Sequence, residues 1–88
     1  MKLLPNVFVS EVDGEYVAVA TGKAGKNFSG MVQMNATSAF IVNALRKKTN
    51  EKKLAASLME EYDLTEEEAT KNIEKVLGQL RKAGWLDE

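Results

Sequence analysis

The sequence predicts an α+β fold in which a three-stranded antiparallel sheet precedes three helices. Strand-forming residues with alternating polarity fill the first third of the chain, and apolar residues at helical spacing fill the rest. With 88 residues, the chain is long enough for one domain. We therefore expect residues 1–88 to form a single domain.

The strands are predicted from three short runs. Residues 7–13 and 15–21 alternate in polarity on either side of Gly14, and Asp13-Gly14 is typical of a tight hairpin turn, which needs positive φ angles. Residues 22–30 contain three glycines and no periodicity, so this stretch is predicted to be a loop. A third strand is predicted over residues 31–34.

The helices are predicted from apolar spacing and from capping residues. Asn35 suits the N-cap of a first helix over about residues 36–47, and Thr49 or Asn50 that of a second helix reaching about residue 62. Thr65 and Glu68 form a capping box that opens the third helix, and Gly84 ends it. Trp85 and Leu86 are expected to fold back onto the core.

The composition argues against catalysis. The chain has no cysteine and no histidine, which removes the disulfide framework, thiolate metal sites and the commonest general base. The glycines of residues 22–30 do not have P-loop spacing, and the carboxylates of residues 60–68 do not have EF-hand spacing. We expect no catalytic residue, no metal site and no cofactor. The N-terminal residues match neither a signal peptide nor a membrane span, which leads us to expect a cytoplasmic protein without membrane contact.

One basic cluster raises the alternative of a DNA-binding regulator. A small sheet with helices joined by a tight turn is typical of winged helix-turn-helix domains, whose recognition helix enters the major groove. Against this, if the third helix were the recognition helix, Glu66, Glu67 and Glu68 would lie against the DNA phosphates and be repelled by them. The formal net charge of −1 gives no general attraction to nucleic acid. The cluster consists of Arg46, Lys47, Lys48, Lys52 and Lys53.

The third strand carries the main functional hypothesis. Its residues Met31, Val32, Gln33 and Met34 bear no charge, whereas exposed sheet edges are usually guarded by charge or proline. An uncharged edge beside a helix is what peptide binding by strand addition requires. Two alternatives stay open on the residues alone. The strand can be central or covered, with its methionines in the core, or its edge can pair with a second copy of the chain to give a homodimer.

Several segments resemble the pyrroloquinoline quinone biosynthesis protein D (PqqD) family. The strand-to-helix segment is the most specific, although Ser38 replaces the usual glycine and Val42 the usual tryptophan. The resembling segments are Leu4-Pro5-Asn6, Glu11-Val12-Asp13-Gly14-Glu15-Tyr16, Met34-Asn35-Ala36-Thr37-Ser38-Ala39-Phe40-Ile41 and Leu80-Arg81-Lys82-Ala83-Gly84-Trp85-Leu86.

The resemblance implies a winged-helix-like domain that binds the leader of a ribosomally made precursor peptide. The leader would add antiparallel to the third strand, in a groove beside the third helix. The domain would then present it to a radical S-adenosylmethionine enzyme or another peptide-modifying enzyme, in natural-product or PQQ-type cofactor biosynthesis. The implied peptide-binding residues are Met31, Val32, Gln33 and Met34 on the strand and Asn72, Lys75, Val76 and Gln79 on the helix. Lys71 and Lys75 would attract acidic leader residues.

Overall fold

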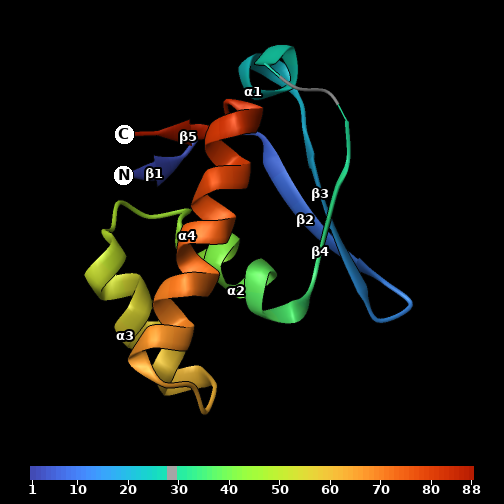
Figure 1. The fold of residues 1–88 in the computed structure, drawn as a ribbon. Coiled ribbons are helices and arrows are strands. Elements are labelled where there is room, and N and C mark those ends of the chain that lie inside the picture. The colour runs from blue at the N-terminus through green and yellow to red at the C-terminus, as the bar shows by residue number, and fades with distance from the viewer. Residues whose placement is uncertain (28–29) are drawn as a thin grey trace.

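The computed structural model describes residues 1–27 and 30–88, and its α+β fold is the predicted one. Strands β2 (Val7–Val12), β3 (Glu15–Ala20) and β4 (Val32–Met34) form an antiparallel sheet in the order β2-β3-β4. Helices α2, α3 and α4 follow, as Figure 1 shows. The arrangement is compatible with a winged-helix-like domain.

The predicted hairpin between β2 and β3 is confirmed. Asp13 and Gly14 both have positive φ, 52° and 82°, as a primed two-residue turn requires. Val12 pairs with Glu15 directly beside the turn, so the turn sets the register of the whole ladder. The register places Val7, Val9, Ala18 and Ala20 on the face that packs against the core.

The capping residues place the helices as predicted. Asn35, Asn50 and Thr65 are the N-caps, and the Thr65–Glu68 capping box is formed in both directions, at 3.0 and 3.1 Å. Gly84 ends the last helix in the left-handed conformation at φ 72°. The helices are α2 (Ala36–Ala44), α3 (Glu51–Glu61) and α4 (Glu66–Ala83).

Helix α2 ends at Ala44, so the prediction that it reaches residue 47 is wrong. In a continuing helix, the Leu45 carbonyl would accept from Thr49. Instead it accepts from Leu3 N at 2.8 Å, and Thr49 N donates to the Met1 carbonyl at 2.9 Å. The N-terminal segment takes both backbone groups and thereby replaces the next helical turn.

The same segment forms a small ribbon that the sequence pattern does not predict. Strand β1 (Lys2–Leu3) pairs antiparallel with β5 (Leu86–Asp87), which brings the two ends of the chain together, as Figure 1 shows. Leu4 N also donates to the Trp85 carbonyl at 2.7 Å. Trp85 is fully buried, which confirms that the segment after Gly84 folds back onto the core.

A short helix, α1 (Gly22–Asn27), replaces most of the loop predicted over residues 22–30. The buried Trp85 indole Nε1 donates to the Ala24 carbonyl at 3.1 Å, and Ala24 itself is fully buried. Gly22 has φ 60°, and a Cβ at Gly25 would lie 2.9 Å from the Ala20 carbonyl oxygen. The glycines therefore serve close packing rather than flexibility. Residues 28 and 29 of the predicted loop lie outside the described part of the chain.

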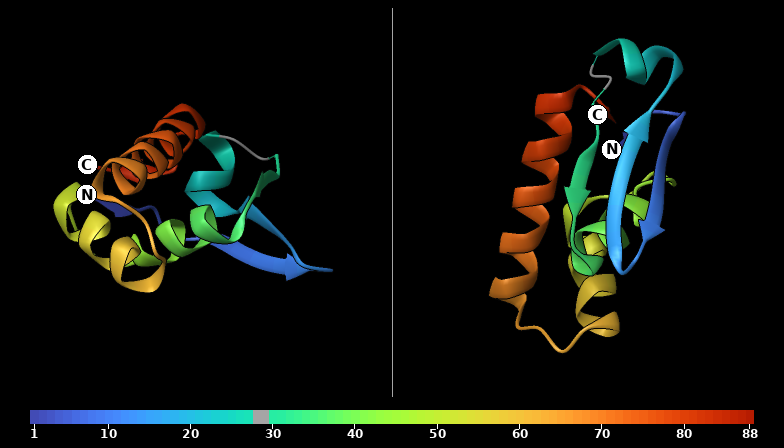
Figure 2. Two further views of the ribbon diagram at one scale, coloured as in Figure 1. Left: turned by 60° about the horizontal axis from the view of Figure 1, so that its bottom comes forward. Right: turned by 90° about the vertical axis from the view of Figure 1, so that its right-hand side faces the viewer.

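The core lies between one face of the sheet and the helices. Figure 2 shows that the helices gather on one side of the sheet and leave its other face uncovered. The long helix α4 supplies the largest share of the apolar lining, from Ala69, Ile73, Val76, Leu77 and Leu80. Their spacing of three and four residues forms one continuous stripe along the helix.

Candidate peptide-binding edge and groove

Strand β4 is an edge strand of the sheet. It pairs with β3 on one side, and within residues 1–27 and 30–88 no strand pairs with its other side. The alternative of a central strand is therefore wrong for the described chain. Its three residues carry no charge, so the edge lacks the lysine or proline that ordinarily blocks strand addition.

The hydrogen-bond parity of the β2–β3 ladder fixes where the backbone groups of β3 point. Thr21 N donates to the Asn6 carbonyl at 2.9 Å, so this opposed pair is hydrogen-bonded. Bonded and non-bonded pairs alternate along antiparallel strands, so Ser10–Val17 is bonded as well. The backbone groups of the intervening residues, Tyr16 and Ala18, therefore point away from β2 and toward β4.

The same alternation determines which residue of β4 faces outward. Ala18 lies opposite Val32, and Tyr16 lies opposite Met34, so these two residues of β4 bond to β3. The backbone N–H and carbonyl of Gln33, between them, point away from the sheet. Gln33 therefore offers both a donor and an acceptor to an added strand.

The side chains of β4 divide between the two faces of the sheet. Val32 and Met34 are half-buried and pack against the core from the helix side. Gln33 is exposed on the opposite face, as is Met31 just before the strand, with 70% of its surface accessible. Of the four predicted peptide-binding residues on the strand, Val32 and Met34 therefore face the helices, whereas Met31 and Gln33 are exposed.

Helix α4 carries the four predicted helical residues on one flank, at the three- and four-residue spacing of one helix face. Lys75 and Gln79 are exposed, and the half-buried Asn72 donates from Nδ2 to the Glu68 carbonyl at 2.8 Å. Val76 is only 2% exposed, so its side chain is part of the core that supports this flank. The surface of the flank is therefore formed by the polar residues.

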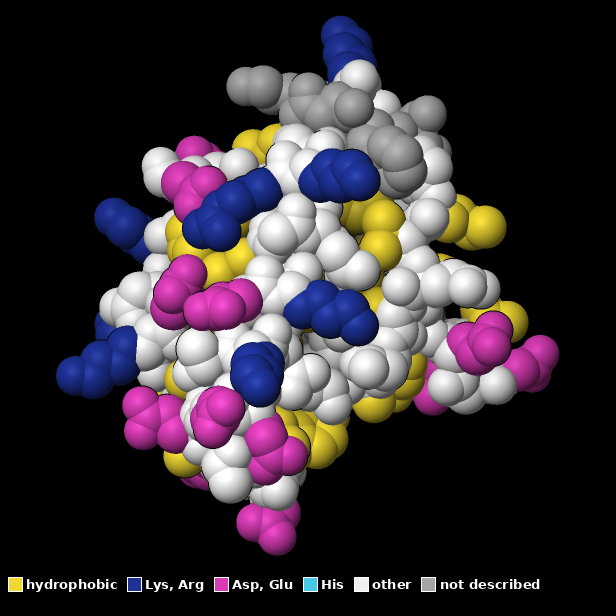
Figure 3. Space-filling view, in the orientation of Figure 1, with side chains coloured by type: hydrophobic (Ala, Val, Ile, Leu, Met, Phe, Trp, Pro, Cys, Tyr) yellow, Lys and Arg dark blue, Asp and Glu magenta, His cyan; other side chains and the backbone are white. Residues whose placement is uncertain are grey.

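Helix α2 packs against both β4 and α4 and therefore lies at the base of the space between them. Figure 3 shows apolar side chains at the surface between α4 and β4, with lysines on the α4 side. Phe40 of α2 is half-buried and meets the Tyr62 ring edge-to-face, with centroids 5.8 Å apart. These elements border a strip of apolar surface, which we call the groove, between the backbone edge of β4 and the lysines of α4.

The hairpin end of the groove carries a polar pair. Glu11 lies directly opposite Tyr16 across the β2–β3 ladder. The Glu11 carboxylate raises the pKa of the Tyr16 phenol above its ordinary value of 10.0, with smaller contributions from burial, the Glu11 hydrogen bond and Tyr62. Tyr16 therefore stays a neutral hydroxyl, able to donate a hydrogen bond, throughout the physiological range.

Two basic residues have partners within the chain. Arg46 Nη1 donates to the Val7 carbonyl at 2.8 Å, which holds the guanidinium against strand β2. Lys71 lies 3.5 Å from Glu67 in an exposed pair of the kind that contributes little to stability. Three glutamates occupy the first turn of α4, as the sequence indicated.

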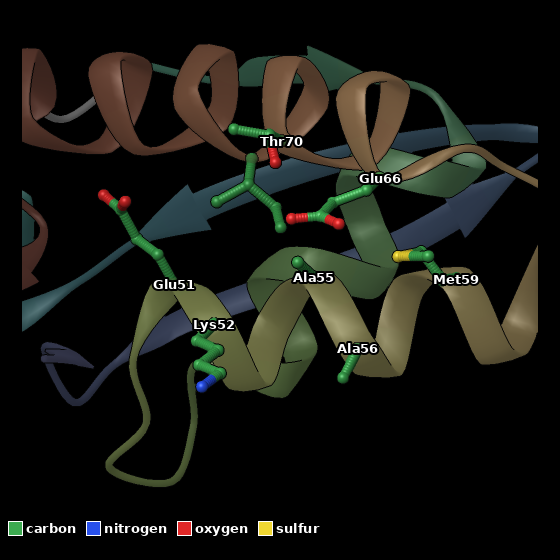
Figure 4. A pocket seen from close by; sticks show the side chains of 8 residues that line it. Glu51, Lys52, Ala55, Ala56, Met59, Glu66 and Thr70 are labelled. Atoms are coloured by element: carbon green, nitrogen blue, oxygen red, sulfur yellow. The ribbon is translucent and has the colours of Figure 1, made fainter.

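A second hollow lies between α3 and α4, outside the groove. It has a volume of about 420 Å³, with Ala55, Ala56, Met59 and Ile73 among its lining residues. Figure 4 shows Glu66 and Thr70 reaching into it from α4. No cluster of acidic, cysteine or histidine side chains that could hold a metal occurs among the described residues, and no helix there is long and apolar enough to cross a membrane.

Fold and site together define a small winged-helix-like α+β domain with an open, uncharged sheet edge beside a long helix. Residues 13–86 match the family described as coenzyme PQQ synthesis protein D (PqqD). The chain therefore belongs to the PqqD family, as its sequence motifs indicated. No curated protein matches the chain.

Two solved structures have the same fold. One is described as TbiB1 in complex with the TbiA(beta) leader peptide; it has a TM-score of 0.73 and 16% identity, over 99% of this chain and 95% of that one. The other is a lasso peptide synthetase B1 complexed with the leader peptide, with a TM-score of 0.69 and 25% identity, over 96% and 93% of the chains. Both were solved with a leader peptide bound.

Proposed function

We propose that this protein binds the leader of a ribosomally synthesised precursor peptide by strand addition to β4 and presents it to a peptide-modifying enzyme. The single observation that carries the proposal is the outward-pointing backbone of Gln33 on an uncharged edge strand. Family membership and the leader peptides bound to both similar structures support the same function. They do not favour the alternative of a DNA-binding regulator.

The groove supplies both affinity and selectivity in this mechanism. An antiparallel guest strand bonds to the Gln33 backbone, and guest side chains opposite Val32 and Met34 point toward the groove floor. Thioether side chains adapt to different guests, which suits Met34 to this contact. On the other wall, Asn72, Lys75 and Gln79 face the guest, and Val76 supports them from below.

The cationic wall favours a leader with acidic residues. Lys75 is exposed on the groove flank of α4, whereas Lys71 is already paired with Glu67. We therefore assign the attraction of leader carboxylates chiefly to Lys75. An exposed charge of this kind acts mainly on the association rate and is screened by salt.

The proposed role is recognition and delivery, without catalysis by this chain. Its partners are the precursor peptide and a radical S-adenosylmethionine or other modifying enzyme. The product is a modified peptide or a PQQ-type cofactor.

An amide-shift titration of labelled protein with a leader peptide from the surrounding gene cluster tests the proposal. We expect shifts at Met31, Val32, Gln33 and Met34, and along the α4 flank from Asn72 to Gln79. Shifts confined to the hollow between α3 and α4 would contradict the strand-addition site. Shifts around Lys47 and Lys52 on adding duplex DNA would favour the DNA-binding alternative.

A further inference from the structure

The outer face of the sheet, which turns away from the helices, is unusually apolar. Its positions are Phe8, Ser10, Val12, Glu15, Val17, Val19, Met31 and Gln33, and Glu15 is the one charged residue among them. Phe8, Val12 and Met31 are 49%, 58% and 70% exposed. A solvated face of an antiparallel sheet is ordinarily polar, and exposed apolar patches mark interaction sites. This face is therefore a candidate interface.

The apolar residues form a row that runs toward the open edge. Phe8 lies directly opposite Val19 on the neighbouring strand. Ala18, the residue before Val19, lies opposite Val32, and Met31 directly precedes Val32 at the start of β4. Side chains opposed in this way lie about 5 Å apart and act as one surface. The row thus crosses the sheet from β2 and ends where a leader strand would add.

We infer that this outer face docks the peptide-modifying enzyme, and that a bound leader completes the docking surface. The inference rests on the proposed function. A leader residue paired with Gln33 points its side chain to the same face as Gln33, because opposed residues in a sheet share a face. The loaded domain then presents a fourth strand beside the apolar row. An enzyme that binds this face therefore distinguishes a loaded domain, with leader bound, from an empty one.

The size of the face favours a larger protein over a second copy of this chain. Strands β2 and β3, of six residues each, and β4, of three, lie about 4.8 Å apart and cover a footprint of roughly 250 Å². Two such faces pack over about 500 Å² in total, well below the ~1,200 Å² at which specific protein interfaces begin. A larger enzyme can extend its contacts beyond the sheet. The near absence of charge also excludes nucleic acid and anionic lipid as the ligands of this face.

A double variant, Phe8→Thr with Val12→Thr, tests the inference. Both side chains are exposed and neither packs against the core, and threonine retains strand propensity, so the fold is preserved. The matched control is Met59→Gln, which changes an apolar residue of α3 that is 38% exposed. Biolayer interferometry measures binding of each domain, with and without saturating leader, to the purified modifying enzyme encoded beside its gene.

We expect the double variant to bind the enzyme about tenfold or more weakly, as truncation at an interface centre does, and Met59→Gln to bind like wild type. Leader affinity, measured separately by titration, should stay within about twofold of the wild-type value for both variants. Strand β3 separates the substituted strand β2 from β4, where the leader binds. The wild-type domain should bind the enzyme more tightly when loaded than when empty.

Three outcomes would overturn the inference. They are an enzyme affinity that the double variant leaves unchanged, equal enzyme affinities for loaded and empty wild-type domain, and self-association in sedimentation that the double variant abolishes. A wild-type domain that binds no leader would instead contradict the proposed function, and the leader titration detects this independently.

Discussion

Replacing Gln33 by proline should disable leader binding while leaving the domain folded. The backbone N–H of Gln33 points out of the sheet, because Val32 and Met34 on either side bond to β3. Proline removes that N–H, and its ring occupies the space through which a guest carbonyl would approach. Proline is tolerated on an edge strand where the missing N–H faces outward.

The expected loss follows from the hydrogen bonds at stake. The Gln33 N–H and carbonyl form two bonds to a guest strand, and each contributes about 0.5–1.5 kcal/mol net. Proline removes the first bond, and its ring keeps the guest backbone from closing on the remaining carbonyl. Losing both bonds costs about 1–3 kcal/mol, which corresponds to a roughly 5- to 150-fold weaker dissociation constant. Fluorescence anisotropy with a labelled leader peptide measures this change directly, and circular dichroism reports whether the fold is retained.

Two companion variants make the result specific. Gln33→Ala keeps the backbone donor and truncates only a side chain on the outer face, so its leader affinity should stay within about twofold of wild type. Val32→Pro removes an N–H that bonds to Ala18 inside the sheet, so it should lower stability rather than leader affinity alone. Wild-type affinity in a folded Gln33→Pro variant, or an equal loss in Gln33→Ala, would refute the reasoning.

Further predictions concern the groove wall, the long helix, the C-terminal anchor and the response to acid. Lys75→Glu should weaken binding of an acidic leader and reduce the salt dependence of that binding, and Lys71→Glu should have a smaller effect. Equal effects of the two variants, in anisotropy titrations at two salt concentrations, would argue against Lys75 as the main attraction for leader carboxylates. Gly78→Ala should raise the free energy of unfolding by about 0.5–1 kcal/mol, because a Cβ there meets nothing within 4 Å, and unchanged denaturant midpoints would contradict this. Trp85→Phe should lower the free energy of unfolding by about 1–3 kcal/mol, because it removes the buried indole donor to the Ala24 carbonyl, and hydrogen exchange should rise first in α1. The hydrogen bond from Thr65 N lowers the pKa of Glu68 below the ordinary 4.5, so its stabilisation is present above pH 4.5 and is lost as the pH falls through the lowered value. Glu68→Gln keeps the capping geometry and should reduce the decline of the melting temperature between about pH 5 and 3, while Glu88, whose pKa is also lowered by its bond to Arg81, still titrates.

Much of the candidate binding site was predictable because strand and helix patterns are local. The uncharged run of Met31 to Met34 and the flank of Asn72, Lys75 and Gln79 can be read directly from the sequence. Which of these residues contributes its backbone and which its side chain could not be predicted in this way. Only the pairing of β4 with β3 shows that Gln33 presents its backbone outward. A pattern of side-chain types contains no information about the hydrogen-bond parity of a neighbouring strand.

The sequence by itself determined the hairpin at Asp13-Gly14, the capped starts of α2, α3 and α4, and the end of α4 at Gly84. Each of these depends on residues within about four positions of one another, where backbone sterics and capping bonds dominate. The tertiary structure decided the rest: helix α1, the β1–β5 ribbon and the early end of α2. These depend on contacts across long stretches of chain, such as Trp85 with Ala24 and Leu3 with Leu45. Such contacts arise only when the core has formed, because a single hydrogen bond cannot offset the entropy of closing so long a loop.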